Sequence, residues 1–434
     1  QAVSGQIAAT AVRAPRRSSL TQNVAAMYAL QIANYVIPLL TLPYLIRVLG
    51  AAQYGLMTIA YAVVFFMVLF VDAGFNTLAT RRLAQPGIGA RRISEIYAAT
   101  QLIKAVQCAA MFLLLFVLTL AVPNIGAAAP IYYATFPIVL GSLLFPTWLF
   151  QGLEIMHLTT LCNVGGRLLA TVAIFVFVKD PGDVATAALL QASATAMSGL
   201  LALPFLFGRL RLSLFIPRYR LWPELRQTFA DARALAPAEY ITDAFSNSGI
   251  FILGLFASDA AVGIYAAIDK IARAGASLFQ PLIKALFPAL SGHWMSASPD
   301  ATEHCRAWTQ RILLLATIAA IAMFAVAPFA LELLFGAGWA EYSALLRVLA
   351  AWLAASVVAT VLGQFWLLAR GERSTYARCL VIAGVFQLIA TVVGAWSFGA
   401  LGLVTATVIA EFVRIALFYL AARNAAKGAT ACAS

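Results

Sequence analysis

Five polar or charged side chains share one face of an otherwise apolar stretch of the chain, residues 264–290. They are Asp269, Arg273, Ser277, Gln280 and Lys284. At 100° per residue, a helix would hold all five within an arc of roughly 80°. Each ionised group at the centre of a bilayer costs roughly 2.5–3.5 kcal/mol. We therefore expect this stripe to face water or a ligand inside a membrane, and not lipid.

Polar stripes of the same kind occur on other apolar stretches. Their amide and hydroxyl groups also suit hydrogen bonds between helices, which need no ligand. Asp269 with Arg273, and Glu411 with Arg414, can form ion pairs within one helix that lower the cost of insertion. A ligand cavity and a structural role therefore both stay open. The stripes include Gln31 and Asn34; Asp72 and Asn76; Asn163 and Arg167; Glu239, Asp243 and Asn247; and Glu411 and Arg414.

Composition places these stripes in a membrane protein. The chain is 63% hydrophobic and 11% charged, with a mean hydropathy of +0.90, whereas soluble domains are about 25% charged. Apolar stretches long enough to cross a bilayer recur along its whole length. We predict an all-α polytopic membrane protein with twelve transmembrane helices. The expected spans are residues 20–46, 55–80, 94–121, 130–153, 159–178, 184–208, 228–256, 262–290, 307–333, 341–368, 375–397 and 399–422.

The distribution of charge predicts the topology. With the N-terminus in the cytoplasm, nearly all basic loop residues fall on the inner side, and only Arg47 and Lys179 lie outside. This positive-inside bias predicts cytoplasmic termini and an even number of spans. It also accounts for the net charge of +12 without a nucleic-acid partner. Topology does not explain the basic residues within spans, which are Lys104, Arg167, Arg233, Lys270, Arg273, Lys284, Arg347 and Arg414.

The loops leave little room for an enzyme. The outer loops, such as residues 179–183 and 257–261, are short, so we expect no catalytic residues and no enzymatic activity. The cysteines and histidines lack the spacing of a metal site, which predicts neither a metal nor a cofactor. Residues up to Ser19 lack an apolar core, so no cleavable signal peptide is expected.

A basic cytoplasmic connector, residues 209–227, divides the chain into two halves. It mixes Arg with Phe, Tyr and Trp, which is typical of an amphipathic segment that lies on anionic lipid. Docking of a partner is the alternative. The six spans on each side predict one six-helix bundle at residues 20–208 and a second at 228–422, with cytoplasmic tails at 1–19 and 423–434.

A short repeat supports two related halves. Residues 51–56 before the second span read AAQYGL, and residues 259–264 before the eighth span read DAAVGI. An even number of spans in each half predicts repeats of parallel topology, related by an axis along the membrane normal. Transporters built in this way hold their substrate between the halves, near the bilayer midplane.

Four short motifs lie in register along the chain. Residues 43–55 read PYLIRVLGAAQYG, 148–154 read WLFQGLE, 262–265 read VGIY and 367–372 read LLARGE. Together they resemble the polysaccharide transporter family, the Wzx-type flippases of the multidrug/oligosaccharidyl-lipid/polysaccharide exporter superfamily. The chain departs from the family where Ile155 and His157 follow Glu154, because family members usually carry further basic residues there.

The resemblance implies a V-shaped pair of six-helix bundles around a central cavity that works by alternating access. It implies that undecaprenyl-pyrophosphate-linked oligosaccharide, an O-antigen or other surface polysaccharide repeat unit, moves from the cytoplasmic to the periplasmic leaflet of a bacterial inner membrane. Coupling to protons or sodium ions is expected from the family. The implied partners are the lipid-linked glycan, membrane lipids and the polysaccharide polymerase machinery.

The polar stripes then take specific roles. Basic side chains offset the lost hydration of phosphates by charge-assisted contacts, and a buried carboxylate can carry a proton. The expected pyrophosphate ligands are Arg273 and Lys284, followed by Lys270, Arg167, Lys104 and Arg414. The expected sugar ligands are Asn34, Gln31, Asn76, Asn247 and Gln280. The expected ion-coupling residues are Asp269, Asp72, Asp243, Glu239 and Glu411.

Three alternatives remain. A drug or cation antiporter of the same superfamily would need an acidic or aromatic cavity, whereas these spans carry many cations. A lipid II flippase usually has helices beyond twelve. A membrane-embedded glycan polymerase or ligase would need a large outer loop with catalytic residues. The sequence favours the oligosaccharide flippase over each of them.

Overall fold

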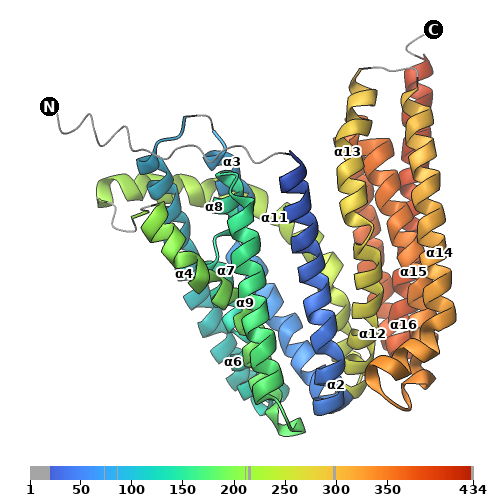
Figure 1. Cartoon of the computed structure of the whole chain (residues 1–434), viewed down its shortest axis with the longest axis horizontal. Coiled ribbons are helices and arrows are strands. Elements are labelled where there is room, and N and C mark those ends of the chain that lie inside the picture. Colours follow the sequence, from blue (N-terminus) through green and yellow to red (C-terminus); the bar gives the residue numbers. More distant parts are fainter. Residues whose placement is uncertain are drawn as a thin grey trace. The chain divides into compact units, whose positions relative to one another are not determined.

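The computed structural model describes residues 20–431, apart from 73, 86, 211, 214–216 and 297–299. Side chains are not described at 20–36, 209, 218, 234–247, 301 and 425–431. Throughout the described part the regular elements are helices (Figure 1). The first group comprises α2 (Leu20–Asp72), α3 (Phe75–Leu83), α4 (Ala90–Ala121), α5 (Pro123–Ala127), α6 (Ala129–Thr135), α7 (Pro137–Leu144), α8 (Thr147–Gly152), α9 (Met156–Phe177) and α10 (Val184–Leu203). The second comprises α11 (Arg218–Phe256), α12 (Asp259–Ser277), α13 (Gln280–Met295), α14 (Ala301–Phe335), α15 (Ser343–Val361) and α16 (Arg373–Ala431).

Several stretches of the described chain are long and apolar enough to cross a membrane. They are Ile37–Leu83, Ala90–Ala121, Ala129–Gly152, Met156–Phe177, Pro181–Gly208, Thr302–Phe335, Trp339–Leu368 and Arg373–Asn424. The expected all-α polytopic fold is confirmed. The number of spans, twelve, stays a prediction, because these stretches number eight.

Two of these stretches contain a glycine whose backbone dihedral angles are not helical. Gly50 inside α2 has φ 77° and ψ 165°, and Gly399 inside α16 has φ 59° and ψ −136°. Only glycine adopts such conformations without a steric penalty. Gly50 lies between the predicted spans 20–46 and 55–80, and Gly399 is the first residue of the predicted span 399–422, which directly follows span 375–397. Each long element therefore consists of two helices.

The prediction of a single helix over residues 262–290 is wrong. Its hydrogen bonding is interrupted at Leu278 and Phe279, where the backbone forms tighter i→i+3 turns to Gly275 and Ala276. Pro281 explains the break, since it has no N–H to donate to the carbonyl of residue 277. The polar stripe is therefore divided between two helices, α12 and α13.

The chain forms two compact units, Gln1–Ile37 with Ala60–Asp243 (unit 1) and Pro38–Ile59 with Ala244–Ser434 (unit 2). The core of unit 1 is built around Trp148 and Phe150, which are fully buried. The core of unit 2 includes Ile283, Ile312 and Phe365. This grouping by packing does not test the predicted bundle boundaries, and the expected tail at residues 1–19 lies outside the described residues.

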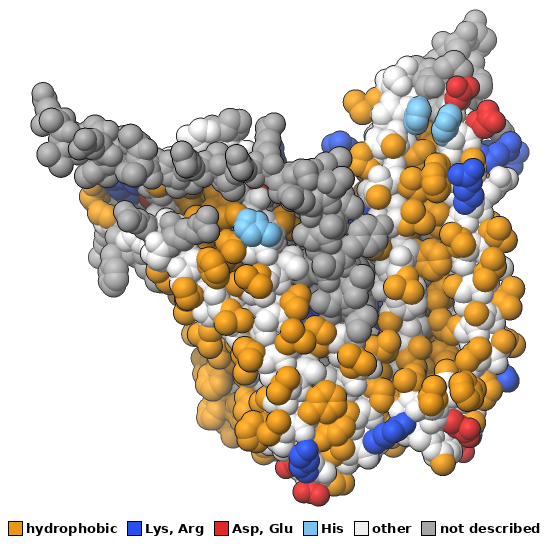
Figure 2. All heavy atoms as spheres, viewed as in Figure 1, with side chains coloured by type: hydrophobic (Ala, Val, Ile, Leu, Met, Phe, Trp, Pro, Cys, Tyr) orange, Lys and Arg blue, Asp and Glu red, His pale blue; other side chains and the backbone are white. Residues whose placement is uncertain are grey.

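Large apolar side chains point outward along the helices. Examples are Leu113 and Leu120 on α4 and Ile321 and Phe329 on α14, each more than half exposed. Figure 2 shows hydrophobic side chains along the length of the visible helices, with charged ones gathered near the helix ends. A soluble protein rarely exposes such extensive apolar surface, which fits helices surrounded by lipid.

Candidate functional site

Unit 1 holds a buried ammonium group among oxygen atoms. Lys104 of α4 is 1% exposed, and its Nζ lies 2.7 Å from Asp72 Oδ1 and 3.3 Å from both Asn76 Oδ1 and the Ser142 carbonyl oxygen. An ammonium group has three protons to donate, so these three oxygens match its capacity. The structure thus brings together three residues to which the sequence gives different roles, Lys104, Asp72 and Asn76.

A local break in the helical structure lies within this cluster. α2 ends at Asp72 and α3 begins at Phe75, with Gly74 between them in the left-handed conformation at φ 76°. The sequence predicts one continuous helix over residues 55–80, which is wrong at this point. The break lies between Asp72 and Asn76, yet both residues still contact Lys104.

Lys104→Met is expected to destabilise the protein. The variant keeps the length of the side chain but leaves the Asp72 carboxylate without its cation, and breaking a buried pair costs about 3–5 kcal/mol. Because Asp72 is 28% exposed, we expect a loss at the lower end of that range. Thermal unfolding of the purified protein measures it.

Lys104→Met combined with Asp72→Asn is the matched control, since it removes both charges. We expect this double variant to recover most of the lost stability. A double variant that unfolds as easily as Lys104→Met would contradict an ion pair as the source of the effect.

Two ion pairs, each within one helix, lie among the described residues of unit 2. Arg273 Nε lies 2.6 Å from Asp269 Oδ2 on α12, and Arg414 Nη2 lies 2.6 Å from Glu411 Oε2 on α16. The Asp269 and Glu411 side chains are 8% exposed. Arg273 differs from its partner because its side chain is 43% exposed and its guanidinium lies 5.3 Å from the centre of the Trp352 ring. Arg273 therefore carries charge to an accessible surface.

Other predicted ligands lie near these pairs without joining them. Lys270 Nζ is 3.5 Å from the Tyr54 hydroxyl, and the Ser277 hydroxyl donates to the Ala274 carbonyl oxygen. Lys284 on α13 is exposed and has no ion-pair partner among the described residues. The stripe predicted from the sequence is therefore not one connected network.

Seven further residues are predicted as ligands or ion-coupling groups. Arg167 lies on α9 and is partly exposed, and Gln280 is the first residue of α13 and is also partly exposed. The other five lie in α2 or α11, and their side chains are outside the described residues: Gln31, Asn34, Glu239, Asp243 and Asn247.

The two halves of the sequence repeat meet in unit 2. A Cβ atom added to Gly55 of α2 would lie 1.7 Å from the Asp259 carbonyl oxygen. A Cβ atom added to Gly263 of α12 would lie 2.0 Å from the Ala51 carbonyl oxygen. Gly55 thus contacts the backbone of α12 four residues before Gly263. Gly263 in turn contacts the backbone of α2 four residues before Gly55. The sequence reveals the matched glycines, but it does not reveal this reciprocal contact, which small residues allow between membrane helices.

Arg47 provides a second contact between residues 38–59 of α2 and the rest of unit 2. Its Nη2 lies 2.6 Å from the Leu333 carbonyl oxygen, near the C-terminus of α14. Cations are favourable at this end of a helix because unpaired carbonyl groups gather there. The arginine and the last glycine of the first sequence motif therefore both attach residues 38–59 to the rest of unit 2.

Comparison with known proteins gives consistent matches. The family described as "Polysaccharide biosynthesis protein" matches residues 20–294. A protein of Escherichia coli (strain K12) named "Putative O-antigen transporter" is 31% identical over 278 residues, which cover 63% of this chain and 65% of that protein. The match thus spans slightly less than two thirds of that relative. A Shigella dysenteriae protein of the same name is 23% identical over 404 residues, which cover 93% of this chain and 100% of that protein.

Solved structures share the fold. The lipid II flippase MurJ in an inward closed conformation has a TM-score of 0.72 with 11% identity, over 92% of this chain and 87% of that one. A multidrug resistance MATE family transporter in an inward-facing conformation has a TM-score of 0.63 with 14% identity, over 91% of this chain and 99% of that one. At these identities the likeness concerns the fold alone.

Proposed function

Because the chain belongs to the polysaccharide biosynthesis protein family, we propose that it moves an undecaprenyl-pyrophosphate-linked oligosaccharide from the cytoplasmic to the periplasmic leaflet. Two relatives carry the name "Putative O-antigen transporter", which supports this substrate class. The structural observation that carries the proposal is the charge held within otherwise apolar helices, at Lys104–Asp72, Asp269–Arg273 and Glu411–Arg414. A polar head group needs such a lining, since hydrocarbon offers it no hydrogen bonds.

Arg273 is the strongest candidate for contact with the pyrophosphate. Its ion pair with Asp269 uses Nε, and a guanidinium carries five N–H donors in a planar fork that suits phosphate oxygens. Lys284 is second, because it is exposed and has no ion-pair partner in the described part of the chain. Lys104 is a weaker candidate in this conformation because its ammonium group is already surrounded by oxygens.

Coupling to a proton or sodium gradient is part of the proposal. Asp72, Asp269 and Glu411 each lie beside a cation. Protonation or sodium binding at such a carboxylate would release its basic partner for the phosphate. The proposal also places the protein in a bacterial inner membrane with both termini in the cytoplasm, near the polysaccharide polymerase machinery.

Transport in vesicles tests the function directly. The full-length protein is reconstituted with a fluorescent undecaprenyl-pyrophosphate oligosaccharide, and a membrane-impermeant quencher reports which leaflet holds the label. We expect the protein to increase the exchange between leaflets at least tenfold over protein-free vesicles. A proton or sodium gradient should bias its direction.

The same vesicles discriminate the alternatives. Movement of ethidium without movement of the glycan lipid would indicate a cation antiporter. Movement of lipid II without movement of the oligosaccharide lipid would indicate a lipid II flippase. Elongation or transfer of the glycan would indicate a polymerase or ligase, and each of these results would overturn the proposal.

A further inference from the structure

The first part of α11 presents a stripe of aromatic and basic side chains. Tyr219, Trp222, Arg226, Phe229 and Arg233 are separated by three or four residues, so they share one face of the helix. All five are exposed. The Arg233 guanidinium lies 5.9 Å from the centre of the Phe229 ring. We call this set the aromatic–arginine stripe.

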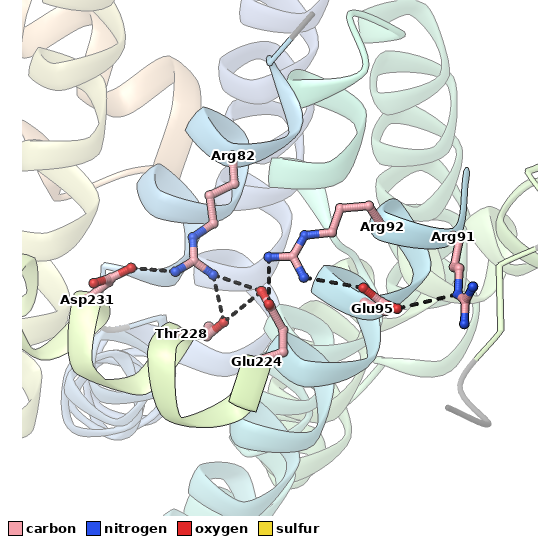
Figure 3. Close-up of polar contacts among 7 residues, drawn as sticks. All are labelled: Arg82, Arg91, Arg92, Glu95, Glu224, Thr228 and Asp231. Atoms are coloured by element: carbon pink, nitrogen blue, oxygen red, sulfur yellow. Dashed lines mark hydrogen bonds and ion pairs between the residues drawn. The ribbon is translucent and has the colours of Figure 1, made fainter. Parts of the chain in front are cut away.

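Arginine side chains from two other helices contact the opposite face of the same helix (Figure 3). Glu224 is 3% exposed and accepts from Arg82 Nη1 at 2.9 Å and from Arg92 Nη2 at 2.7 Å. Arg82 also donates to the Thr228 hydroxyl at 3.0 Å and pairs with Asp231. These contacts orient α11 about its own axis, so the stripe must point away from α3 and α4.

Apolar packing supports the same orientation. Ala232 is 2% exposed and packs with Phe75, Leu78 and Ile103, and Leu225 packs against that cluster. The buried face and the exposed face of the helix are therefore clearly separated. Burial of Glu224 also leaves the stripe without acidic residues, because the acidic residues of this part of α11, Glu224 and Asp231, both pair with Arg82.

We propose that the aromatic–arginine stripe docks on the anionic head groups of the lipid leaflet at this end of unit 1. Figure 1 shows the first part of α11 running crosswise to the spanning helices of unit 1, at the end of the unit where α3 lies. Tyr, Trp and Phe favour the boundary between head groups and acyl chains. The arginines complement a negatively charged lipid surface, and the positive-inside rule predicts that this surface is cytoplasmic.

The lipid contact would give α11 a mechanical role. The helix is bound to α3 and α4 on one side through Arg82 and Arg92, and it continues to Phe256. An anchor at the lipid surface would hold its first part at constant depth. This inference concerns a surface of the protein and does not depend on which molecule is transported.

Fluorescence quenching locates the stripe. A variant with its five native cysteines replaced is labelled with an environment-sensitive dye at Trp222→Cys or Phe229→Cys, and at Gln227→Cys as a control. Gln227 is exposed on the same helix but lies outside the stripe. In vesicles of phosphatidylcholine with phosphatidylglycerol, we expect quencher groups on the lipid chains to reduce the signal at 222 and 229 severalfold more than at 227. Aqueous iodide should show the reverse order.

The lipids that co-purify with the protein test the role of the two arginines in the stripe. Arg226→Gln with Arg233→Gln should reduce the enrichment of phosphatidylglycerol around the purified protein severalfold, as measured by mass spectrometry of co-purified lipids. Arg373→Gln with Arg378→Gln is the matched control, since both residues are exposed basic residues of α16. We expect the control to keep the enrichment of the unmodified protein.

Three outcomes would overturn the proposal. Equal iodide quenching at 222, 227 and 229 would place the stripe in water. Labels at 222 and 229 shielded from both quenchers would mean that protein covers the stripe. An equal loss of phosphatidylglycerol in the two charge variants would mean that total charge, and not the stripe, attracts the lipid.

Discussion

Gly263→Ala and Gly55→Ala are each expected to force α2 and α12 apart and to abolish transport, although each adds only one methyl group. The new carbon would lie 2.0 Å or 1.7 Å from a carbonyl oxygen of the facing helix. A backbone atom cannot rotate away as a side chain can, so the helices themselves must move. Overpacking of this kind costs roughly 1–3 kcal/mol, and we expect a lower melting temperature together with the loss of glycan movement.

Two other glycines of unit 2 provide a graded control. A Cβ atom at Gly254 would lie 3.1 Å from an Ile59 side-chain atom, which can shift, and a Cβ atom at Gly292 would have no heavy atom within 4 Å. Gly254→Ala should therefore have a small effect. Gly292→Ala should be neutral or slightly stabilising, because alanine favours a helix interior over glycine by roughly 0.5–1 kcal/mol. If all four variants melt and transport alike, the contact between α2 and α12 has no functional role.

Arg273→Ala is expected to abolish the export of surface glycan while the protein still reaches the membrane. The substitution removes the accessible guanidinium and leaves the Asp269 carboxylate, 8% exposed, without its cation. Loss of one partner from a buried pair costs about 3–5 kcal/mol, and because Arg273 is 43% exposed we expect a loss at or below the lower end of that range. Arg273→Lys keeps the charge but loses the planar fork, so we expect partial export. Quantifying surface glycan in cells lacking the native protein measures both.

Two controls separate substrate binding from a structural role. Arg347→Ala is matched, because Arg347 is also exposed and lies 5.4 Å from an aromatic ring centre, that of Phe324; we expect it to export normally. Asp269→Asn with Arg273→Gln removes both charges and leaves neither unpaired. Export restored to the normal level in this double variant would show that the pair is structural and that Arg273 does not bind the substrate.

The membrane fold and the local ion pairs were determined by the sequence itself. Hydropathy depends on composition. Apolar stretches of sufficient length become helices, because in a bilayer the backbone N–H and C=O groups find no water and must hydrogen-bond to one another. Asp269 and Arg273 are four residues apart, so the pairing of their side chains follows from the pitch of one helix. The break before Pro281 also has a local cause, a missing N–H group.

Tertiary structure alone decided which distant residues meet. Lys104 and Asp72 are 32 residues apart, and Arg82 reaches Glu224 across 142 residues. Nothing in the periodicity of one helix specifies how a second helix is rotated against it. The same limit applies to Gly55 and Gly263: the repeat shows that they correspond, but their contact depends on the packing of α2 against α12. Helix rotation and crossing are set by the whole core, and they decided which predicted charges are paired and which remain accessible.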